Sequence, residues 1–117
     1  MDVYCEFSLA AGRRLTGVPA HHPCARVHGH TFRVRLTVSG PVDPRTGFVI
    51  DFADVQRAFD PVFEALDHRF LNEVPGLENP TSEHLAVWIW DRLKGPLGAL
   101  SAVEITETGA SGVVYRG

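Results

Sequence analysis

A run of alternating side chains between residues 28 and 38 places the strongest constraint on how this chain folds. If Gly29 is extended, His28 and His30 point to the same side, because side chains alternate between the two faces of a strand. The next residues of that parity are all apolar: Phe32, Val34, Leu36 and Val38. The segment therefore predicts a strand with one face in a hydrophobic core and two imidazoles at the end of that face.

Two interpretations of this histidine pair stay open from the residues alone. The imidazoles are either hydrogen-bonded and inert, or they are two ligands of a first-row metal ion. A zinc site needs at least one more protein ligand, and no residue stands at a fixed spacing to supply it. His21 and His22 in the preceding loop could reach the pair. Cys24 is either a small hydrophobic residue or, beside imidazoles or a metal, a base or nucleophile.

Composition excludes several classes of protein. The chain has 117 residues, a formal net charge of −3 and two cysteines. Its length predicts a single domain, residues 1–117, that buries a core without disulfides. The negative charge argues against nucleic-acid binding, and the absence of any run of about 18 apolar residues argues against a membrane span. Two cysteines do not make a disulfide framework, so we expect a cytoplasmic protein.

Alternating hydrophobic residues indicate four strands. The first covers residues 2–11, the second 30–39 and the last 113–115. The third includes Val103 to Glu107, whose odd-numbered side chains share one face. Residues 48–50, after a turn rich in proline and glycine, predict one more short strand end.

Two helices are predicted between these hairpins. Asp51 is the expected N-cap of the first, whose apolar face extends from Phe52 to Leu66 and in which Pro61 should cause a kink or a restart. Thr81 is the expected N-cap of the second, which ends by Gly95. Hairpins flanking a helix pair predict the α+β class, with an antiparallel sheet and the helices on one face.

Three polar residues are candidates for ligand binding. Glu107 shares the face of Val103 and Ile105, so its carboxylate lies on the buried side of a strand. Either the strand has reached solvent there, or the carboxylate accepts hydrogen bonds from a cationic or amidine-like N–H edge. Thr81 and Ser82 are either plain helix caps or donors to a ligand at the start of the second helix.

Several segments also carry a family pattern, in order along nearly the whole chain. They are CARVHGHTF (24–32), GFVIDF (47–52), LDHRFLN (66–72), PGLENPTSE (75–83), Glu107-Thr108 and VYRG (114–117). Together they resemble the 6-pyruvoyl-tetrahydropterin synthase family, and most closely its bacterial 6-carboxy-tetrahydropterin synthase branch, which serves queuosine biosynthesis.

The resemblance implies a tunnelling fold, or T-fold. Its four-stranded antiparallel sheet carries two helices on one face, three sheets close into a barrel, and two trimers form a homohexamer with active sites between subunits. The family are carbon–oxygen lyases that act on a small pterin, 7,8-dihydroneopterin triphosphate. Zinc is their cofactor and acts as a Lewis acid on the hydroxyls of the substrate side chain.

The resemblance also implies roles for individual residues. His28 and His30 match two of the three zinc-binding histidines of the family. Cys24 matches the cysteine that moves the proton, and Asp67 and His68 match its partners. Their common role requires that they come together in space.

The ring-binding residues match the family, but one metal ligand does not. Glu107 matches the carboxylate that anchors the pterin ring, and Thr81 and Ser82 match hydroxyl residues near it. The third zinc histidine falls on Arg13, which has no lone pair to give and stays protonated. Arg13 continues the parity of Ala11, so it should point toward the site. A unit charge about 5 Å from a dication repels it by roughly 6–7 kcal/mol at an effective dielectric constant of about 20. We therefore expect zinc to be absent or weakly bound, unless Arg13 turns away or a loop histidine replaces it.

Three functions follow from this pattern. The first is a pterin-binding homologue whose zinc-dependent activity is lost or altered, with Arg13 holding a substrate phosphate or carboxylate. The second is an active 6-carboxy-tetrahydropterin synthase in which His21 or His22 is a substitute metal ligand, as the complete proton-transfer set favours. The third is a non-catalytic assembly protein, against which the residues of the ring site argue.

Overall fold

The computed structural model describes all residues from Met1 to Gly117. Its helices and strands follow the order β1 (Asp2–Arg13), β2 (His28–Ser39), α1 (Phe52–Leu66), α2 (Ser82–Leu93), β3 (Leu100–Thr108) and β4 (Ser111–Tyr115), with short 3-10 helices at Pro23–Ala25 and Leu71–Glu73. No helix is both long enough and apolar enough to cross a lipid bilayer.

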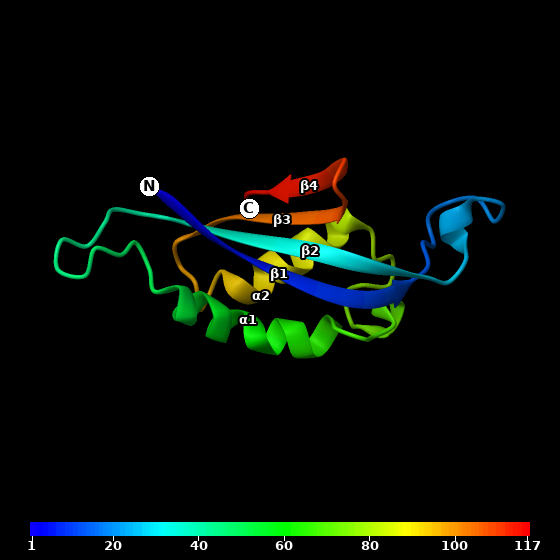
Figure 1. Ribbon diagram of the computed structural model, residues 1–117. Coiled ribbons are helices and arrows are strands. Elements are labelled where there is room, and N and C mark those ends of the chain that lie inside the picture. Colours follow the sequence, from blue (N-terminus) through cyan, green and yellow to red (C-terminus); the bar gives the residue numbers. More distant parts are fainter.

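The strands form one antiparallel sheet in the order β1-β2-β3-β4. Both helices lie against the same face of this sheet (Figure 1). The predicted α+β class, with a four-stranded antiparallel sheet and two helices on one face, is therefore confirmed. The outer edges of β1 and β4 have no strand beside them within the chain.

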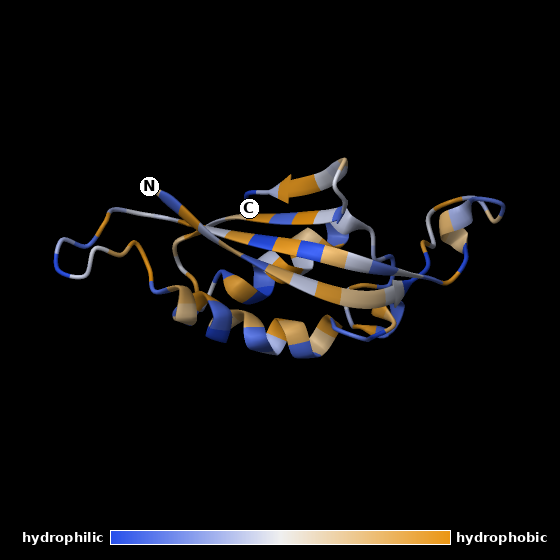
Figure 2. Ribbon diagram, viewed as in Figure 1, coloured by the Kyte–Doolittle hydropathy of each residue, from blue (hydrophilic) through white to orange (hydrophobic).

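The core lies between the sheet and the helices. The alternating apolar residues of β2 are fully or almost fully buried, as their parity predicted. They pack with the buried face of α1, which consists of Val55, Phe59, Val62 and Leu66. Hydrophobic and polar residues alternate along the strands in Figure 2, which is the pattern of a sheet with one buried and one exposed face. Each fully buried large side chain contributes roughly 1.5–3 kcal/mol to stability, so this layer fixes the register of the strands.

One local prediction was wrong, and another was settled in part. Residues 48–50 form no strand, because no neighbouring strand lies beside them to accept their hydrogen bonds. Of the kink or restart predicted at Pro61, the restart does not occur, because helix α1 continues to Leu66. Pro61 lies on the exposed side of the helix, and buried residues before and after it hold the two halves against the core.

The strands also extend further than the alternation alone indicated, and this extension builds the site. β1 continues to Arg13 and β2 begins at His28, and these two residues are direct partners across the antiparallel pair. The end of β3 and the start of α2 approach them, because Glu107 contacts both Arg13 and Ser82. Four segments that are distant in the sequence therefore meet at one end of the sheet.

Candidate functional site

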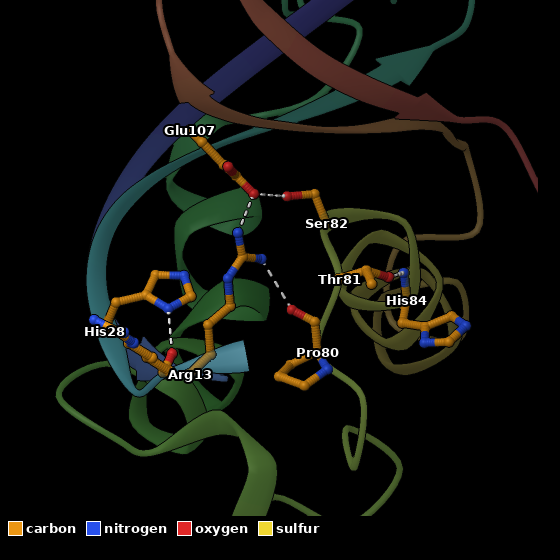
Figure 3. A network of polar contacts seen from close by, with 8 residues as sticks. Arg13, His28, Pro80, Thr81, Ser82, His84 and Glu107 are labelled. Atoms are coloured by element: carbon orange, nitrogen blue, oxygen red, sulfur yellow. Dashed lines mark hydrogen bonds and ion pairs between the residues drawn. The ribbon is translucent and has the colours of Figure 1, made fainter. Parts of the chain in front are cut away.

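The buried guanidinium of Arg13 is the centre of this end of the sheet (Figure 3). Only 3% of the residue is exposed. Its Nη1 donates a hydrogen bond of 2.9 Å to the carbonyl oxygen of Pro80, and its Nη2 makes an ion pair with Glu107 Oε1. The guanidinium carbon also lies 5.0 Å from the centre of the Phe32 ring, within the range of a cation–π contact. Arg13 thus points into the molecule, in the direction that its parity predicts.

The carboxylate of Glu107 has one occupied and one free oxygen. Ser82 Oγ donates a hydrogen bond of 2.5 Å to Oε1, the same atom that pairs with Arg13. Oε2 makes no hydrogen bond within the chain. Burial raises the pKa of Glu107, but the hydrogen bonds from Ser82 and Arg13 and the charge of Arg13 outweigh it and hold the pKa below its usual range. Glu107 is therefore ionised at neutral pH.

The start of helix α2 supplies the hydroxyl groups. Thr81 is the N-cap, as predicted, and its side chain accepts a hydrogen bond of 3.1 Å from the backbone N–H of His84. Ser82 is the first residue of the helix and is almost fully buried. Its hydroxyl points at Glu107 instead of capping the helix, so a glutamate on β3 and a serine on α2 form one polar unit (Figure 3).

A cavity of about 280 Å³ opens beside this unit. This volume is near the lower limit for pockets that hold small organic ligands. Its walls are formed by Arg13, Leu15, Cys24, Thr81, Ser82, Glu83, Glu107, Ser111, Gly112 and Val113. The structure thus brings together five of the residues that the sequence singled out, from β1, the following loop, α2 and β3.

The two histidines of β2 lie on the same side of the strand, as their spacing predicted. Their ring centres are 4.9 Å apart, in an edge-to-face arrangement. His28 Nδ1 lies 2.7 Å from the carbonyl oxygen of Arg26, while Nε2 is buried and has no hydrogen-bond partner. Burial, followed by the charge of Arg13, lowers the pKa of His30.

The residues around these imidazoles do not fit the three-ligand zinc site that the family resemblance implies. A catalytic zinc ion takes three protein ligands and an open position. The third position holds Arg13, and nowhere do three or more histidine, cysteine, aspartate or glutamate side chains gather in a way that could hold a metal ion. The buried guanidinium would in addition repel a dication.

The two loop histidines that could have replaced the missing ligand have other surroundings. Both His21 and His22 are exposed. His22 Nδ1 accepts a hydrogen bond of 3.1 Å from the backbone N–H of Cys24 and thereby caps the short 3-10 helix. This contact orients Cys24, whose side chain lines the cavity.

Asp67 and His68 form a second polar unit, and neither of them lines this cavity. Asp67 Oδ1 accepts a hydrogen bond of 3.0 Å from the backbone N–H of Ala10, and Asp67 Oδ2 lies 2.7 Å from His68 Nδ1. His68 has a left-handed backbone with φ of 56°, which is uncommon outside glycine and turns its ring outward. Together with His30 it lines a hollow of about 450 Å³ that does not include Cys24. A single chain therefore does not assemble the predicted proton-transfer set of cysteine, aspartate and histidine.

The Asp67 contacts predict a pH effect on stability. The N–H of Ala10, and then His68, lower the pKa of Asp67 below its usual range. A group with a lowered pKa in the folded state contributes stability above its unfolded pKa of about 3.9, and that contribution is lost as the pH falls. We expect wild type to have a higher free energy of unfolding than Asp67→Asn near pH 6, and this difference to disappear below about pH 4. Urea unfolding from about pH 6 to pH 3 measures it. Asp60→Asn, at an exposed position on α1, is the control and should follow wild type. Parallel curves for Asp67→Asn and wild type would contradict the prediction.

Three parts of this site were missed from the sequence. The pairing of Arg13 with Glu107 joins residues 94 positions apart. The backbone carbonyl of Pro80 also binds Arg13, and although Pro80 lies in the family segment 75–83, nothing in that segment indicates this contact. The hairpin residues Ser111 to Val113 also line the cavity. Two signals could have indicated them: they lie between the family segments at 107–108 and 114–117, and Val113 begins the predicted last strand.

Comparisons with known proteins agree with this architecture. The family model described as 6-pyruvoyl tetrahydropterin synthase matches residues 2–117. A 6-carboxy-5,6,7,8-tetrahydropterin synthase from Synechocystis sp. is 39% identical over 97% of this chain and 91% of its own length. The human 6-pyruvoyl tetrahydrobiopterin synthase is 40% identical over 77% of this chain, but only 66% of its own length is matched. The structure of the 6-pyruvoyl tetrahydropterin synthase from Caenorhabditis elegans superimposes with a TM-score of 0.92 at 26% identity and covers 100% of this chain and 95% of that one. This chain therefore belongs to the 6-pyruvoyl tetrahydropterin synthase family.

Proposed function

We propose that this protein binds a pterin in the cavity beside Glu107, and that its zinc-dependent synthase activity is lost or altered. Membership of the family supports a pterin-processing function. One observation carries the assignment of the site: Glu107 lines the cavity together with Thr81 and Ser82, and its ionised carboxylate keeps one oxygen, Oε2, without a hydrogen bond in the chain. A free carboxylate oxygen in a small cavity suits the amidine-like N–H edge of a pterin ring.

The surrounding residues support this assignment. Arg13 and Ser82 fix the carboxylate through Oε1, so that little side-chain entropy is lost when a ring binds to the other oxygen. Leu15 and Val113 are apolar members of the cavity wall and can contact the flat faces of a ring. The hydroxyl of Thr81 adds a polar group at the same wall.

We further propose that the protein assembles as a barrel of three chains and as a hexamer of two such barrels. The unpaired edges of β1 and β4 support closure of the sheet between subunits. In such an assembly, with sites between subunits, Cys24 of one chain and the Asp67–His68 unit of a neighbour would form the proton-transfer set. The cytoplasmic location and the link to queuosine stay predictions from the sequence.

An active 6-carboxy-tetrahydropterin synthase with a substitute metal ligand is the second candidate. The position of Cys24 in the cavity wall favours it, because a cysteine there can exchange protons with a bound pterin. The substitute ligand would have to be His21 or His22, which requires the loop 14–27 to rearrange, since His22 now caps the 3-10 helix. The third candidate is a non-catalytic assembly protein, which would not require the free carboxylate oxygen of Glu107.

A binding and turnover experiment separates these candidates. We expect chelator-treated protein to bind neopterin with the same affinity as untreated protein, because no contact of the proposed ring site includes a metal. We expect its turnover of 7,8-dihydroneopterin triphosphate to be at least about 100-fold slower than that of the Synechocystis relative, because the stabilisation that a Lewis acid supplies amounts to several kcal/mol. Fluorescence titration and product analysis measure the two quantities. Protein with one zinc per subunit and fast turnover would support the second candidate instead, and absence of any pterin binding would support the third.

A further inference from the structure

The hairpin of β3 and β4 contains a β-bulge at Glu107. Thr106 pairs with Gly112 and Thr108 pairs with Ser111, so Glu107 is an extra residue of β3 that has no partner in β4. A bulge bends its strand and changes the direction of a side chain, and bulges are common next to functional sites. The course of the backbone at this bulge therefore decides where the carboxylate of Glu107 lies.

Gly112, which stands opposite the start of the bulge, has no room for a side chain. A Cβ atom there would lie 2.6 Å from the carbonyl oxygen of Ile105 and 3.2 Å from Thr106 Oγ1. At no other glycine of the chain would a Cβ atom come within 3.0 Å of a backbone atom elsewhere in the chain. Gly112 is not among the glycines with a positive φ, so the close approach of β3, and not the backbone conformation, requires glycine here.

Strand β3 is held in place before the bulge but not at it. Ile105 is fully buried and pairs with Val34 of β2, which is also fully buried. The ladder between β3 and β2 ends at Thr106, and residues 106–108 are half-buried or exposed. A side chain at position 112 would therefore displace β4 and residues 106–108, because the core prevents Ile105 from moving away.

Both side-chain partners of Glu107 lie outside this hairpin. Arg13 is on β1 and Ser82 is on α2, and both contact Oε1 of the carboxylate (Figure 3). Ser82 Oγ lies 2.5 Å from that oxygen, and a hydrogen bond weakens steeply when its distance and angle change. A displaced hairpin carries Glu107 away from both partners, because neither of them moves with it.

From this arrangement we propose that Gly112 is a positioning residue for ring recognition. Its lack of a side chain lets β4 lie close to β3 at the bulge, and this contact sets the place from which Glu107 presents Oε2 to the ligand. The proposal rests on the pterin site described above. It adds a residue that determines how well the site discriminates a ring with an N–H edge from a ring of the same shape without one.

The test compares two ring compounds of nearly the same size in the presence of a chelator. They are 6-methylpterin, which carries a small methyl side chain, and 6-methyllumazine, in which a carbonyl oxygen replaces the amino group of the ring. The carboxylate of Glu107 accepts from the N–H edge of the first but faces an acceptor oxygen in the second. Fluorescence titration gives both affinities, and their ratio is the ring preference.

Two alanine variants of the same hairpin form a matched pair. Gly112→Ala introduces the methyl group that collides with Ile105, whereas Gly109→Ala introduces one that meets nothing within 4 Å. Neither glycine has a positive φ, so alanine fits both backbone conformations. The comparison therefore isolates the close approach at Gly112.

Wild type and Gly109→Ala should bind 6-methylpterin about 30- to 100-fold more tightly than 6-methyllumazine, as expected for hydrogen bonds to a charged group. In Gly112→Ala this preference should fall below about 5-fold, while the affinity for 6-methyllumazine changes by less than about 3-fold. A change that only weakened the fold or narrowed the cavity would lower both affinities together and leave their ratio unchanged.

Deletion of Thr108 is a second test that keeps Gly112. It removes the extra residue, so that Glu107 pairs with Ser111 and the turn keeps Gly109 and Ala110 between the strands. The straightened strand should also lower the ring preference below about 5-fold. Thermal unfolding checks that each variant is folded, and either folded variant suffices.

The outcomes separate the role of Gly112 from the ring site itself. A ring preference that survives in folded Gly112→Ala or in the folded deletion variant would overturn the positioning role and leave the ring site intact. An equal loss of both affinities in Gly112→Ala would overturn it as well. If wild type binds both compounds equally, Glu107 does not recognise the N–H edge, and if it binds neither, the proposed pterin function fails; the role of Gly112 fails in both cases.

Discussion

Replacing Glu107 with alanine should lower the free energy of unfolding by about 3 kcal/mol and weaken pterin binding by at least about 30-fold. The two effects arise from the two roles of one carboxylate. Arg13 is 97% buried and its charge is balanced by Glu107, so removal of the carboxylate leaves an uncompensated cation inside the protein. The same change removes the free oxygen that would accept from the ring. Urea unfolding measures the first effect and fluorescence titration with 6-methylpterin the second.

A glutamate on the same strand provides the matched control. Glu104 is also on β3, and its side chain is 30% exposed, compared with 28% for Glu107. Its carboxylate lies 4.0 Å from Arg35, on the other face of the sheet from the cavity. Glu104→Ala therefore removes an equally exposed carboxylate, but we expect it to cost less than about 1 kcal/mol and to leave pterin binding unchanged.

A double variant keeps the prediction testable if Glu107→Ala does not fold. Arg13→Leu together with Glu107→Ala removes the buried cation along with its partner. It should be more stable than Glu107→Ala by about 2 kcal/mol, because replacing both members of a buried pair costs less than removing one. A folded Glu107→Ala protein that binds 6-methylpterin like wild type would refute the ring-anchoring role of Glu107.

Strand parity explains why so much of this site could be predicted from the sequence. The positions of His28 and His30 on one face follow from alternation in a strand, and burial of Phe32 to Val38 fixes which face that is. Parity also placed Arg13 on the inner side of β1. The N-caps Asp51 and Thr81 follow from local chemistry, because a short oxygen-bearing side chain satisfies free N–H groups at the start of a helix.

The ion pair could not be predicted in the same way. Parity indicates the face on which a side chain lies, but not its distance from a side chain on another strand. Arg13 and Glu107 are 94 residues apart, on strands that are not neighbours, since β2 lies between them. The sequence therefore predicts a separate ligand group for each residue, an anion for Arg13 and an N–H edge for Glu107. In the folded chain, Arg13 and Glu107 instead form an ion pair with each other.

The separation of Cys24 from His68 shows a second limit. The family pattern names both residues, but a pattern along one chain does not say whether a site is completed within that chain. His68 does not line the cavity of Cys24 but the separate hollow beside His30. Whether these residues meet depends on how chains associate, and the pairing of sheet edges between subunits leaves little trace in a single sequence.

Replacing Arg13 with histidine should convert this site into one that binds zinc, with about one ion per subunit, while wild type retains less than about one-tenth of an ion. The change removes a cation that repels a dication by roughly 6–7 kcal/mol at about 5 Å. It also adds a third imidazole on the same face as His28 and His30, directly opposite His28 in the register of β1 and β2. Elemental analysis after dialysis against excess zinc and then buffer measures the stoichiometry.

Two further variants separate the removal of charge from the addition of a ligand. Arg13→Gln removes the charge and adds no imidazole, so it should bind zinc at least about 100-fold more weakly than Arg13→His. Adding His28→Ala to Arg13→His removes one of the three imidazoles and should abolish stoichiometric binding. Equal zinc content in Arg13→Gln and Arg13→His would show that repulsion alone excluded the ion.

The stability of Arg13→His with and without zinc shows whether Glu107 requires a buried positive charge beside it. Histidine is too short to replace both contacts of the guanidinium, so Glu107 loses its buried partner and the apoprotein should be destabilised. A bound dication would restore positive charge near the carboxylate, so zinc should raise the unfolding temperature of Arg13→His and leave that of wild type unchanged. If the zinc-bound Arg13→His protein stays less stable than wild type, the ion does not restore the charge balance that Arg13 gives to Glu107. If no zinc binds at all, the geometry of the strands excludes the ion and the arginine is not the cause.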